Sequence, residues 1–595
     1  MGRQTLSNPA AECGTVSRSA CNSPCVLDSS DAADWGEALR DTVPRSAPPA
    51  SALANFSAAP SFLPMSLNRR RFFSRSGLLA ATSLAAPAIV RAAEPGNAQP
   101  GQKPRHIIHL VADGMAMATL SMADHLSRAG RGRGLSWMNL YNQPGTVGSF
   151  MDVRSLNSLV TDSSASSCAW GSGSRIVNGT VNVLPDGTVL TPLYTLFGQQ
   201  GWKRGLVTTT EITHATPAGF AASGLKREAA ESIAVQYLER GVEVLLGGGQ
   251  KYFDATRRKD KRDLVPDYQT AGYQVFKTAK DFAAAKNDGK WLGIFSNSHL
   301  PFTVDWNHDA KLKEAVPHLA ELTRKALAKL ENENHFILQV EGGRVDHGAH
   351  MCDAVAALYD QIAFDEALDV CLDFQKRHPD TLLVITTDHP TGNPGLSGFG
   401  SNYGFSSALF TNVQRVKRSF SEIFKRLNVP GPDSAPLAKG AVAPKVLDDP
   451  KFIAEVIREA TEYQLSAEKA AAFAPFLTRK GKAQFTLMNS NVAQLGQLMA
   501  NHLGIGWTGT AHCSDYVPLV ALGPGAERFR GFIQNTDVFR HYTQLAGIDF
   551  KNPSAPIKED LKVPQDLDKD LQKEKEKEAK EKSAALWSEQ HWVAA

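Results

Sequence analysis

The chain has 595 residues, of which 42% are hydrophobic and 21% are charged. This composition is typical of a soluble globular protein with a large core. The formal net charge of +3 is too close to balance to indicate nucleic acid or a membrane surface as the partner. Local motifs, rather than bulk charge, must therefore indicate the function.

The first 64 residues are rich in Ser, Ala and Pro and show no hydrophobic periodicity. An export signal normally lies near the start of a protein, and here the features of such a signal begin only at Met65. We therefore expect residues 1–64 to be either a disordered leader or a stretch upstream of the true start of translation.

Residues 65–93 have the features of a twin-arginine-type signal peptide. Arg70 and Arg71 precede two Phe residues, an apolar run follows, and small residues end the segment. About fourteen moderately apolar residues that include Pro87 are too few for a membrane span. We expect export by the twin-arginine machinery to the periplasm or the medium, with membrane anchoring as the alternative.

Residues 94–557 alternate between short apolar runs and longer amphipathic segments. We predict strands at 105–112, 206–210, 242–246, 336–340, 382–385 and 517–522 and helices at 117–128, 233–240, 315–330 and 354–377. Gly247, Gly248 and Gly249 lack the spacing of a phosphate-binding loop and predict a turn. The alternation predicts a three-layer α/β/α fold with a central, mostly parallel sheet.

The pattern changes between about residues 400 and 500. Gly and Pro are frequent there, and helices are predicted at 452–463, 467–473 and 491–502. We interpret this stretch as a helical insertion into the sheet domain. Residues 558–595 form a charged tail in which opposite charges stand four residues apart, a pattern that favours a solvated helix. We assign the tail no chemistry.

Four cysteines follow the signal, Cys168, Cys352, Cys371 and Cys513, and none has CxxC spacing. Zinc sites built on thiolates are therefore not expected. We expect each thiol to be a small buried residue, and a bridge between Cys352 and Cys371 stays open as an alternative.

Carboxylates and imidazoles cluster where three predicted strands end. Asp113 follows the strand at 105–112, a run from Glu341 to His350 follows the strand at 336–340, and Asp388 and His389 follow the strand at 382–385. Ligands of open α/β sheets bind at the carboxyl ends of the strands. Carboxylate with imidazole is a ligand set suited to catalytic zinc. Its repetition predicts more than one metal ion in one cleft.

Each of these residues also has a plainer structural interpretation. Asp113 could end a turn, Ser163 could belong to a helix N-cap, and His512 could be a structural loop histidine. Asp346 and His350 stand four residues apart, so a helical turn would put both on one face. Ser163 lacks the GxSxG context of a serine hydrolase, which leaves a metal ion as its activator.

The order of these motifs resembles the alkaline phosphatase family from about residue 105 to residue 522. The matching segments are Ala112-Asp113-Gly114-Met115, Thr161-Asp162-Ser163, His214-Ala215-Thr216-Pro217-Ala218, Val340-Glu341-Gly342, Asp346-His347-Gly348-Ala349-His350, Thr387-Asp388-His389 and Thr510-Ala511-His512. So many segments in one order leave little room for chance.

The resemblance implies a role for each matching position. Ser163 would be the nucleophile that becomes phosphoserine. Two zinc ions and a third ion, normally magnesium, would be bound by three sets of residues: Asp346, His350 and His512; Asp113, Asp388 and His389; and Asp113, Thr216 and Glu341. Arg227 would bind phosphate, with the neighbouring Lys226 as its rival.

Two histidines vary within the family that the chain resembles. His214 and His347 stand where some members have Asp and Lys. Imidazole suits softer ions than magnesium, so His214 favours zinc or cobalt at the third site. His347 would reach phosphate through water and would supply less positive charge than Lys. We expect both histidines, together with Arg227, to lie on the substrate side of the site.

The resemblance implies an exported phosphomonoesterase. Two metal ions would clamp the attacking and leaving oxygens, and the planar guanidinium of Arg227 would bind two phosphate oxygens. One alternative is a related hydrolase of diesters, sulfate esters or phosphonates. Glu341, with Thr216 and Arg227, favours monoesters, and Ser163 has no sulfatase context. Another is an inactive phosphate- or metal-binding protein. The natural substrate and the oligomeric state, with a homodimer among the options, stay open.

Overall fold

The computed structural model describes residues 102–429, 445–478, 481, 483, 485–488 and 490–559. The predicted leader and signal peptide, and nearly all of the charged tail, lie outside these residues. No helix of the described part is long and apolar enough to cross a membrane.

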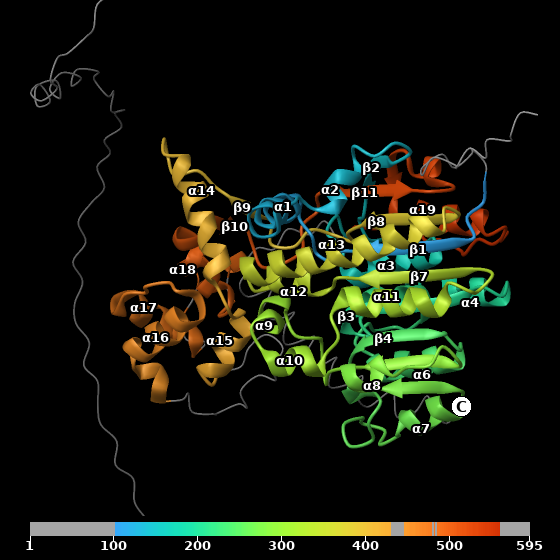
Figure 1. Cartoon of the computed structure of the whole chain (residues 1–595), viewed down its shortest axis with the longest axis horizontal. Helices are drawn as coiled ribbons and strands as arrows, with labels where there is room; N and C mark the ends of the chain where they lie inside the picture. Colours follow the sequence, from blue (N-terminus) through green and yellow to red (C-terminus); the bar gives the residue numbers. More distant parts are fainter. Residues whose placement is uncertain are drawn as a thin grey trace, which may run out of the picture. The chain divides into compact units, whose positions relative to one another are not determined.

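A ten-stranded sheet forms the centre of the described residues (Figure 1). Its strand order is β12-β2-β11-β8-β1-β7-β3-β4-β6-β5. Strand β11 is antiparallel to both of its neighbours, and the other pairings in this sheet are parallel. The strands are β1 (His106–Val111), β2 (Val147–Asp152), β3 (Lys203–Glu211), β4 (Val244–Gly248), β5 (Tyr273–Phe276), β6 (Lys290–Ile294), β7 (Phe336–Glu341), β8 (Thr381–Thr386), β11 (Val517–Leu522) and β12 (Gly531–Gln534).

Helices cover both faces of this sheet. Successive strand residues point to opposite faces, so Leu383 and Ile385 of β8 join one hydrophobic core and Leu382 and Val384 join the other. The first core includes helices α1 (Met117–Arg131), α2 (Ser136–Leu140), α8 (Ala279–Ala283), α11 (Leu319–Leu330) and α13 (Ala354–Arg377). The second includes α3 (Ser163–Ser172), α4 (Leu193–Gln199), α5 (Ala215–Ala221), α6 (Ala230–Glu239), α7 (Leu264–Thr270) and α19 (Asn535–Leu545). The predicted three-layer, mostly parallel fold is confirmed.

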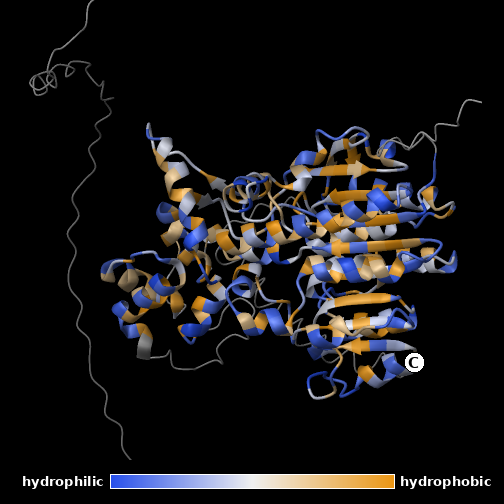
Figure 2. Cartoon of the chain, viewed as in Figure 1, coloured by the Kyte–Doolittle hydropathy of each residue, from blue (hydrophilic) through white to orange (hydrophobic). Residues whose placement is uncertain are grey.

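The apolar character of the strands explains this arrangement (Figure 2). All six residues of β1, β7, β8 and β11 are buried. A parallel strand covered by helices on both faces has no solvent side, so nearly continuous apolar sequence is required.

A segment of helices lies between the two strands of a small antiparallel sheet, β9 (Pro394–Leu396) and β10 (Ile505–Trp507). Its apolar residues, such as Phe420, Ile453 and Leu495, belong to the same core as α11 and α13. The helices of this segment are α14 (Gly404–Phe410), α15 (Phe420–Arg426), α16 (Pro450–Thr461), α17 (Ala467–Leu477) and α18 (Ala493–Leu503).

The prediction of a single helix over residues 315–330 is wrong at its start. Helix α10 (Ala310–Ala315) ends before α11 begins at Leu319, and α9 (Thr303–Asn307) precedes both. Val316 has an extended backbone, with φ −123° and ψ 121°. Pro317 follows it, and a proline disfavours helical backbone at the residue before it.

The turn predicted at Gly247, Gly248 and Gly249 begins later than expected. Gly247 and Gly248 belong to β4, and only Gly249 leaves the strand, with φ +93°. A Cβ atom on Gly248 would lie 1.9 Å from the carbonyl oxygen of Ser298. This glycine therefore allows two backbone segments to approach each other closely.

The four described cysteines, Cys168, Cys352, Cys371 and Cys513, are all free. The bridge left open between Cys352 and Cys371 is thus not formed. Burial raises the pKa of the Cys168, Cys352 and Cys371 thiols, which makes reactive thiolates unfavourable at these positions.

Candidate active site

The predicted metal ligands lie at one edge of the large sheet. Asp113 follows β1, Glu341 is the last residue of β7, and Asp388 and His389 follow β8. Strand β1 pairs in parallel with both β7 and β8, in registers that align the ends of the three strands. Side chains at these ends therefore converge at the carboxyl edge, where open α/β sheets bind ligands.

His512 reaches the same edge because β11 runs in the opposite direction. The residues before an antiparallel strand lie beside the carboxyl ends of its neighbours, and β11 is antiparallel to β8. A bridge between Thr391 and His512 holds the segment before β11 against the loop after β8.

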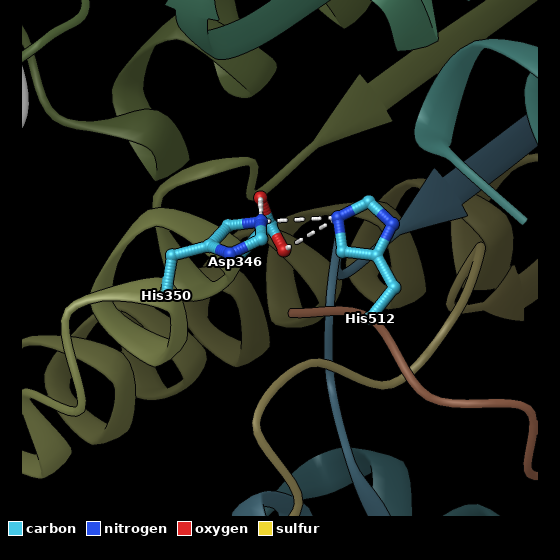
Figure 3. Close-up of side chains that lie close together, drawn as sticks. All are labelled: Asp346, His350 and His512. Atoms are coloured by element: carbon cyan, nitrogen blue, oxygen red, sulfur yellow. Dashed lines mark hydrogen bonds and ion pairs between the residues drawn. The ribbon is translucent and has the colours of Figure 1, made fainter. Parts of the chain in front are cut away.

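Asp346, His350 and His512 form the first candidate metal group (Figure 3). Asp346 and His350 lie four residues apart on helix α12 (Arg344–His350), as the spacing predicted. Nε2 of His350 is 3.2 Å from Asp346 Oδ2, and Nε2 of His512 is 3.7 Å from Asp346 Oδ1. Three ligand atoms from a helix and a loop thus face one small volume.

Backbone carbonyls set the orientation of both imidazoles in this group. Nδ1 of His350 donates to the Thr510 carbonyl at 2.6 Å, and Nδ1 of His512 donates to the Thr161 carbonyl at 2.8 Å. The proton of each neutral ring is then on Nδ1, so two unprotonated Nε2 atoms face each other at 3.0 Å. Two lone pairs at this distance fit a shared cation, and carbonyl contacts of this kind orient histidine ligands of metals.

Asp113, Asp388 and His389 form the second group, beside Ser163. Nε2 of His389 lies 3.1 Å from Asp388 Oδ2 and 3.7 Å from Asp113 Oδ1. The Ser163 hydroxyl oxygen lies 3.1 Å from the same nitrogen. A cation bound by this group would therefore lie next to the serine hydroxyl.

Asp113, His214 and Glu341 form a third group, which shares Asp113 with the second. The Thr216 hydroxyl donates to Asp113 Oδ2 at 3.4 Å, so Thr216 lies at this group as predicted. The hydroxyls of Thr208 and Thr210 both donate to Glu341 Oε2. They fix the carboxylate without occupying its other oxygen.

Several oxygens of these groups fit metal ions. Asp113 Oδ1, Asp388 Oδ2 and Glu341 Oε1 are buried and have no hydrogen-bond partner within the described residues. Buried polar atoms are normally paired. Burial, together with the neighbouring carboxylates of Asp388 and Asp346, raises the pKa of Asp113 well above its ordinary value, and burial raises the pKa of Glu341 to about 7. Such crowded carboxylates are suited to cation binding.

Helix α3 holds Ser163 at its first position. Asp162 is the N-cap, and its carboxylate accepts from the backbone N–H of Ala165 at 2.8 Å. Helix α3 packs against α5 at very short range, since a Cβ on Gly171 would lie 2.0 Å from the carbonyl oxygen of Gly219. The Ser167 hydroxyl, one turn into α3, donates to the Thr216 carbonyl at 2.6 Å, so α3 lies beside the start of α5.

Arg227 is joined to the residue before the candidate nucleophile. Its Nη1 donates to Asp162 Oδ2 at 2.9 Å, while Asp162 also caps the helix that begins with Ser163. This ion pair holds the Arg227 guanidinium beside the residue that precedes Ser163.

Three further residues of the site were not predicted. Thr391 donates its hydroxyl proton to Asp346 Oδ1 at 2.6 Å and lies 3.3 Å from His389 Nδ1, so it links the first two groups. The ring of His299 lies 4.3 Å from that of His347 and 5.7 Å from that of His214. Arg344 contacts His347 directly. His299 follows β6 at the same sheet edge, which is the signal that could have identified it.

Comparisons with known proteins identify the family of the chain. The family model described as alkaline phosphatase matches residues 104–548. Alkaline phosphatase 3 of Bacillus subtilis (strain 168) is 31% identical over 389 residues, which are 64% of this chain and 76% of that protein. Streptomycin-6-phosphate phosphatase of Streptomyces griseus is 31% identical over 374 residues, or 55% and 82% of the two chains. The crystal structure of Thermus thermophilus alkaline phosphatase has a TM-score of 0.69 and 31% identity, and covers 80% of this chain and 98% of its own.

Proposed function

The chain belongs to the alkaline phosphatase family of phosphomonoesterases, and we propose that it acts through a phosphoserine formed on Ser163. The observation that carries this proposal is the 3.1 Å distance between Ser163 Oγ and His389 Nε2. It puts the Ser163 hydroxyl beside the second candidate metal group.

We assign one zinc ion to each of the first two groups and a third ion to Asp113, Thr216 and Glu341. When bound, these ions would supply the positive charge that activates the serine hydroxyl and offsets the charge of the phosphate. The imidazole and carboxylate donors of the first two groups suit zinc, and the oxygens of the third suit magnesium. His214 adds an imidazole to the third group, which makes zinc or cobalt the alternative there.

In the first step Ser163 Oγ attacks phosphorus and loses its proton. A bond forms between Oγ and phosphorus, the bond from phosphorus to the ester oxygen breaks, and the ester oxygen gains a proton, so that the serine proton is balanced and the alcohol leaves. Water then attacks the phosphoserine, the Oγ–phosphorus bond breaks, and Ser163 regains a proton as inorganic phosphate departs. Arg227 binds two non-bridging oxygens throughout, because its planar guanidinium matches their spacing.

The substrate class can be tested on purified protein loaded with zinc and magnesium. We expect hydrolysis of p-nitrophenyl phosphate to exceed that of bis(p-nitrophenyl) phosphate and p-nitrophenyl sulfate. Ser163→Ala should lower kcat/KM for the monoester by more than about 10³-fold, as for other serine nucleophiles. A preference for the bis-ester or the sulfate would contradict the substrate class, and equal activity in Ser163→Ala would contradict the nucleophile.

The metal at the third group calls for a separate test. Elemental analysis of purified protein after dialysis against mixed zinc, cobalt and magnesium identifies the third equivalent: it is magnesium if the oxygens of Asp113, Thr216 and Glu341 select the ion, and zinc or cobalt if the imidazole of His214 does. His214→Asp should exchange that equivalent for magnesium, because carboxylate oxygens suit a hard cation. Magnesium in both proteins would show that His214 does not select the ion.

We further propose that the protein is exported through the twin-arginine machinery. The support is the sequence of residues 65–93, and the family model begins to match only at residue 104. Cell fractionation of the protein expressed from Met65 should find phosphatase activity outside the cytoplasm. Replacing Arg70 and Arg71 together by Lys should retain the activity inside, whereas unchanged export would contradict the twin-arginine route.

A further inference from the structure

Arg344, which is buried, and His347, which is partly buried, form a hydrogen-bonded pair next to the third metal group. Both lie on α12, three residues apart, and the ring of His347 is 5.5 Å from that of His214. We propose that Arg344 is a positioning residue that holds His347 in one tautomer and one orientation for phosphate binding. The inference rests on the proposed function, together with the water-mediated contact with phosphate that is expected of His347 from the sequence.

The polarity of one hydrogen bond fixes the tautomer of His347. Nη1 of Arg344 lies 2.7 Å from His347 Nδ1. A guanidinium has only donors, so Nδ1 must accept and cannot carry a proton. The ring of His347 is then neutral, with its proton on Nε2. His347 can therefore offer one N–H donor, and the positive charge of the pair resides on Arg344.

Arg344 is itself held firmly in place. The residue is 3% exposed, and its guanidinium lies over the ring of Phe302 with 3.6 Å between the guanidinium carbon and the ring centroid. Such stacking of a desolvated guanidinium is favourable. The backbone N–H of Arg344 also donates to the Thr209 hydroxyl at 3.2 Å. The donor that orients His347 is thus fixed by contacts on two further segments.

A second imidazole restricts the ring of His347 from another side. His299 packs edge to face against it, with 4.3 Å between ring centroids. The backbone N–H of Glu211 donates to His299 Nδ1 at 3.2 Å, so His299 is also neutral with its proton on Nε2. Neither ring can reorient without losing its donor.

A lysine at position 347 would carry a positive charge itself, whereas neutral His347 has the positive charge of Arg344 beside it. A donor that is hydrogen-bonded to a charged group is polarised by it, and bonds in such a chain strengthen one another. The guanidinium of Arg344 therefore makes the Nε2–H of His347 a better donor to phosphate or to a bridging water. Arg344 acts through His347 and not on phosphate directly.

A double-mutant cycle tests this role on the metal-loaded enzyme. Arg344→Met should raise KM for p-nitrophenyl phosphate and the inhibition constant of inorganic phosphate about tenfold, the size of one charge-assisted hydrogen bond, while kcat changes less than about threefold. In a His347→Ala background, Arg344→Met should add less than about twofold, because the group it positions is absent. Arg344→Lys, which keeps a pure donor, should recover part of the loss.

A merely structural role would give a different result. Arg344→Met would then cost the same factor in both backgrounds, together with a lower Tm, and that outcome would overturn the proposal. The matched control is Arg458→Met, which removes an arginine with an i,i+3 ion pair on the surface of α16. It should leave KM and the phosphate inhibition constant unchanged.

Nitrogen-15 NMR of histidine-labelled holoenzyme gives an independent readout. The signals of His347, identified by their absence in His347→Ala, should show a protonated Nε2 and an unprotonated Nδ1, and Arg344→Met should shift them toward a mixture of tautomers. A protonated Nδ1 in the unmodified enzyme would refute the inference even if the enzyme is a phosphomonoesterase. Conversely, a protein without phosphatase activity would refute the proposed function while leaving the NMR result meaningful.

Discussion

The two candidate zinc groups differ sharply in exposure. In the second group the side chains of Asp113, Asp388 and His389 are all 0% exposed. In the first group Asp346 is 5% exposed, whereas the His350 side chain is 36% exposed. The His512 side chain is 14% exposed, so the first group opens to solvent mainly at His350, whereas the second group lies fully buried beside Ser163. We infer that the second zinc group serves the nucleophile Ser163. The first zinc group then serves the reacting molecules that enter from solvent and return to it.

The difference follows from how each group is built. The buried ligands come from turns directly after two central strands, β1 and β8. The exposed ligands come from a short helix and from the loop before β11. Gly114 allows the two groups to lie close together: it has φ +73°, and a Cβ there would be 2.5 Å from Asp346 Oδ1. A larger residue would push the groups apart and would strain the backbone.

The largest expected effect comes from replacing one histidine in each candidate zinc group. We expect both His389→Ala and His350→Ala to lower kcat/KM by more than about 100-fold, since changes outside the ligand set already cost up to that much. Added imidazole should restore activity to His350→Ala, whose vacated position opens to solvent. It should not restore His389→Ala, whose position is enclosed. Activity assays over a range of imidazole and zinc concentrations measure both effects.

Equal rescue of the two variants would contradict the assigned difference in exposure. Metal analysis provides the control, because each variant should lose one equivalent of zinc and retain the other.

A smaller effect should come from the packing of α3 on α5. Gly171→Ala adds a methyl group where a Cβ would be 2.0 Å from the Gly219 carbonyl oxygen. Overpacking of this kind costs roughly 1–3 kcal/mol of unfolding free energy. It should also move Ser163 relative to the buried group, lowering kcat about tenfold, as small misplacements do. Chemical denaturation and steady-state kinetics measure the two effects, and unchanged kcat with reduced stability would contradict the positioning role.

Much of the fold was predictable from the sequence. The runs before Asp113, Glu341 and Asp388 are long, apolar and bounded by polar turns, so they identified three central strands. Helix α13 was predicted with its observed bounds, because its caps and periodicity agree. The direction of β11 could not be predicted, since pairing direction depends on neighbours distant in sequence. For the same reason His512 looked like an isolated loop residue.

The candidate site was also only partly predictable from the sequence. Ligand residues follow strand ends and carry their own chemical signal, so they could be named from the sequence. Thr391, His299 and Arg344 act through contacts that only the folded chain provides. Arg344 even lies within a recognised motif, yet its hydrogen bond to His347 depends on the stacking against Phe302 from another segment.

The smallest expected effect concerns buried carboxyls outside the metal groups. Burial raises the pKa of Asp353 and of Asp360 to about 7, from an ordinary value of 3.8. The folded protein thus holds these protons to higher pH than the unfolded chain does. Their contribution to the free energy of unfolding is full below about pH 4 and is lost as the pH rises through about 7. Neither residue belongs to a candidate metal group found among the described residues, so we expect no bound ion to offset this loss.

Asp360→Asn should therefore make the pH dependence of unfolding shallower between about pH 4 and pH 7. Denaturation of the metal-saturated protein at several pH values measures the slope. Asp373→Asn, on the exposed face of the same helix, should keep the slope of the unmodified protein. Identical slopes for all three proteins would show that Asp360 keeps its ordinary pKa.

The most direct test of the account is to trap the covalent intermediate. Metal-loaded enzyme is mixed with p-nitrophenyl phosphate, quenched in acid within the first turnovers, digested and analysed by mass spectrometry. We predict one phosphate on the peptide that contains Ser163, at that serine, and none in Ser163→Ala. Continued turnover with no phosphate on Ser163, or with phosphate on another residue, would contradict the claim that the buried group serves this nucleophile.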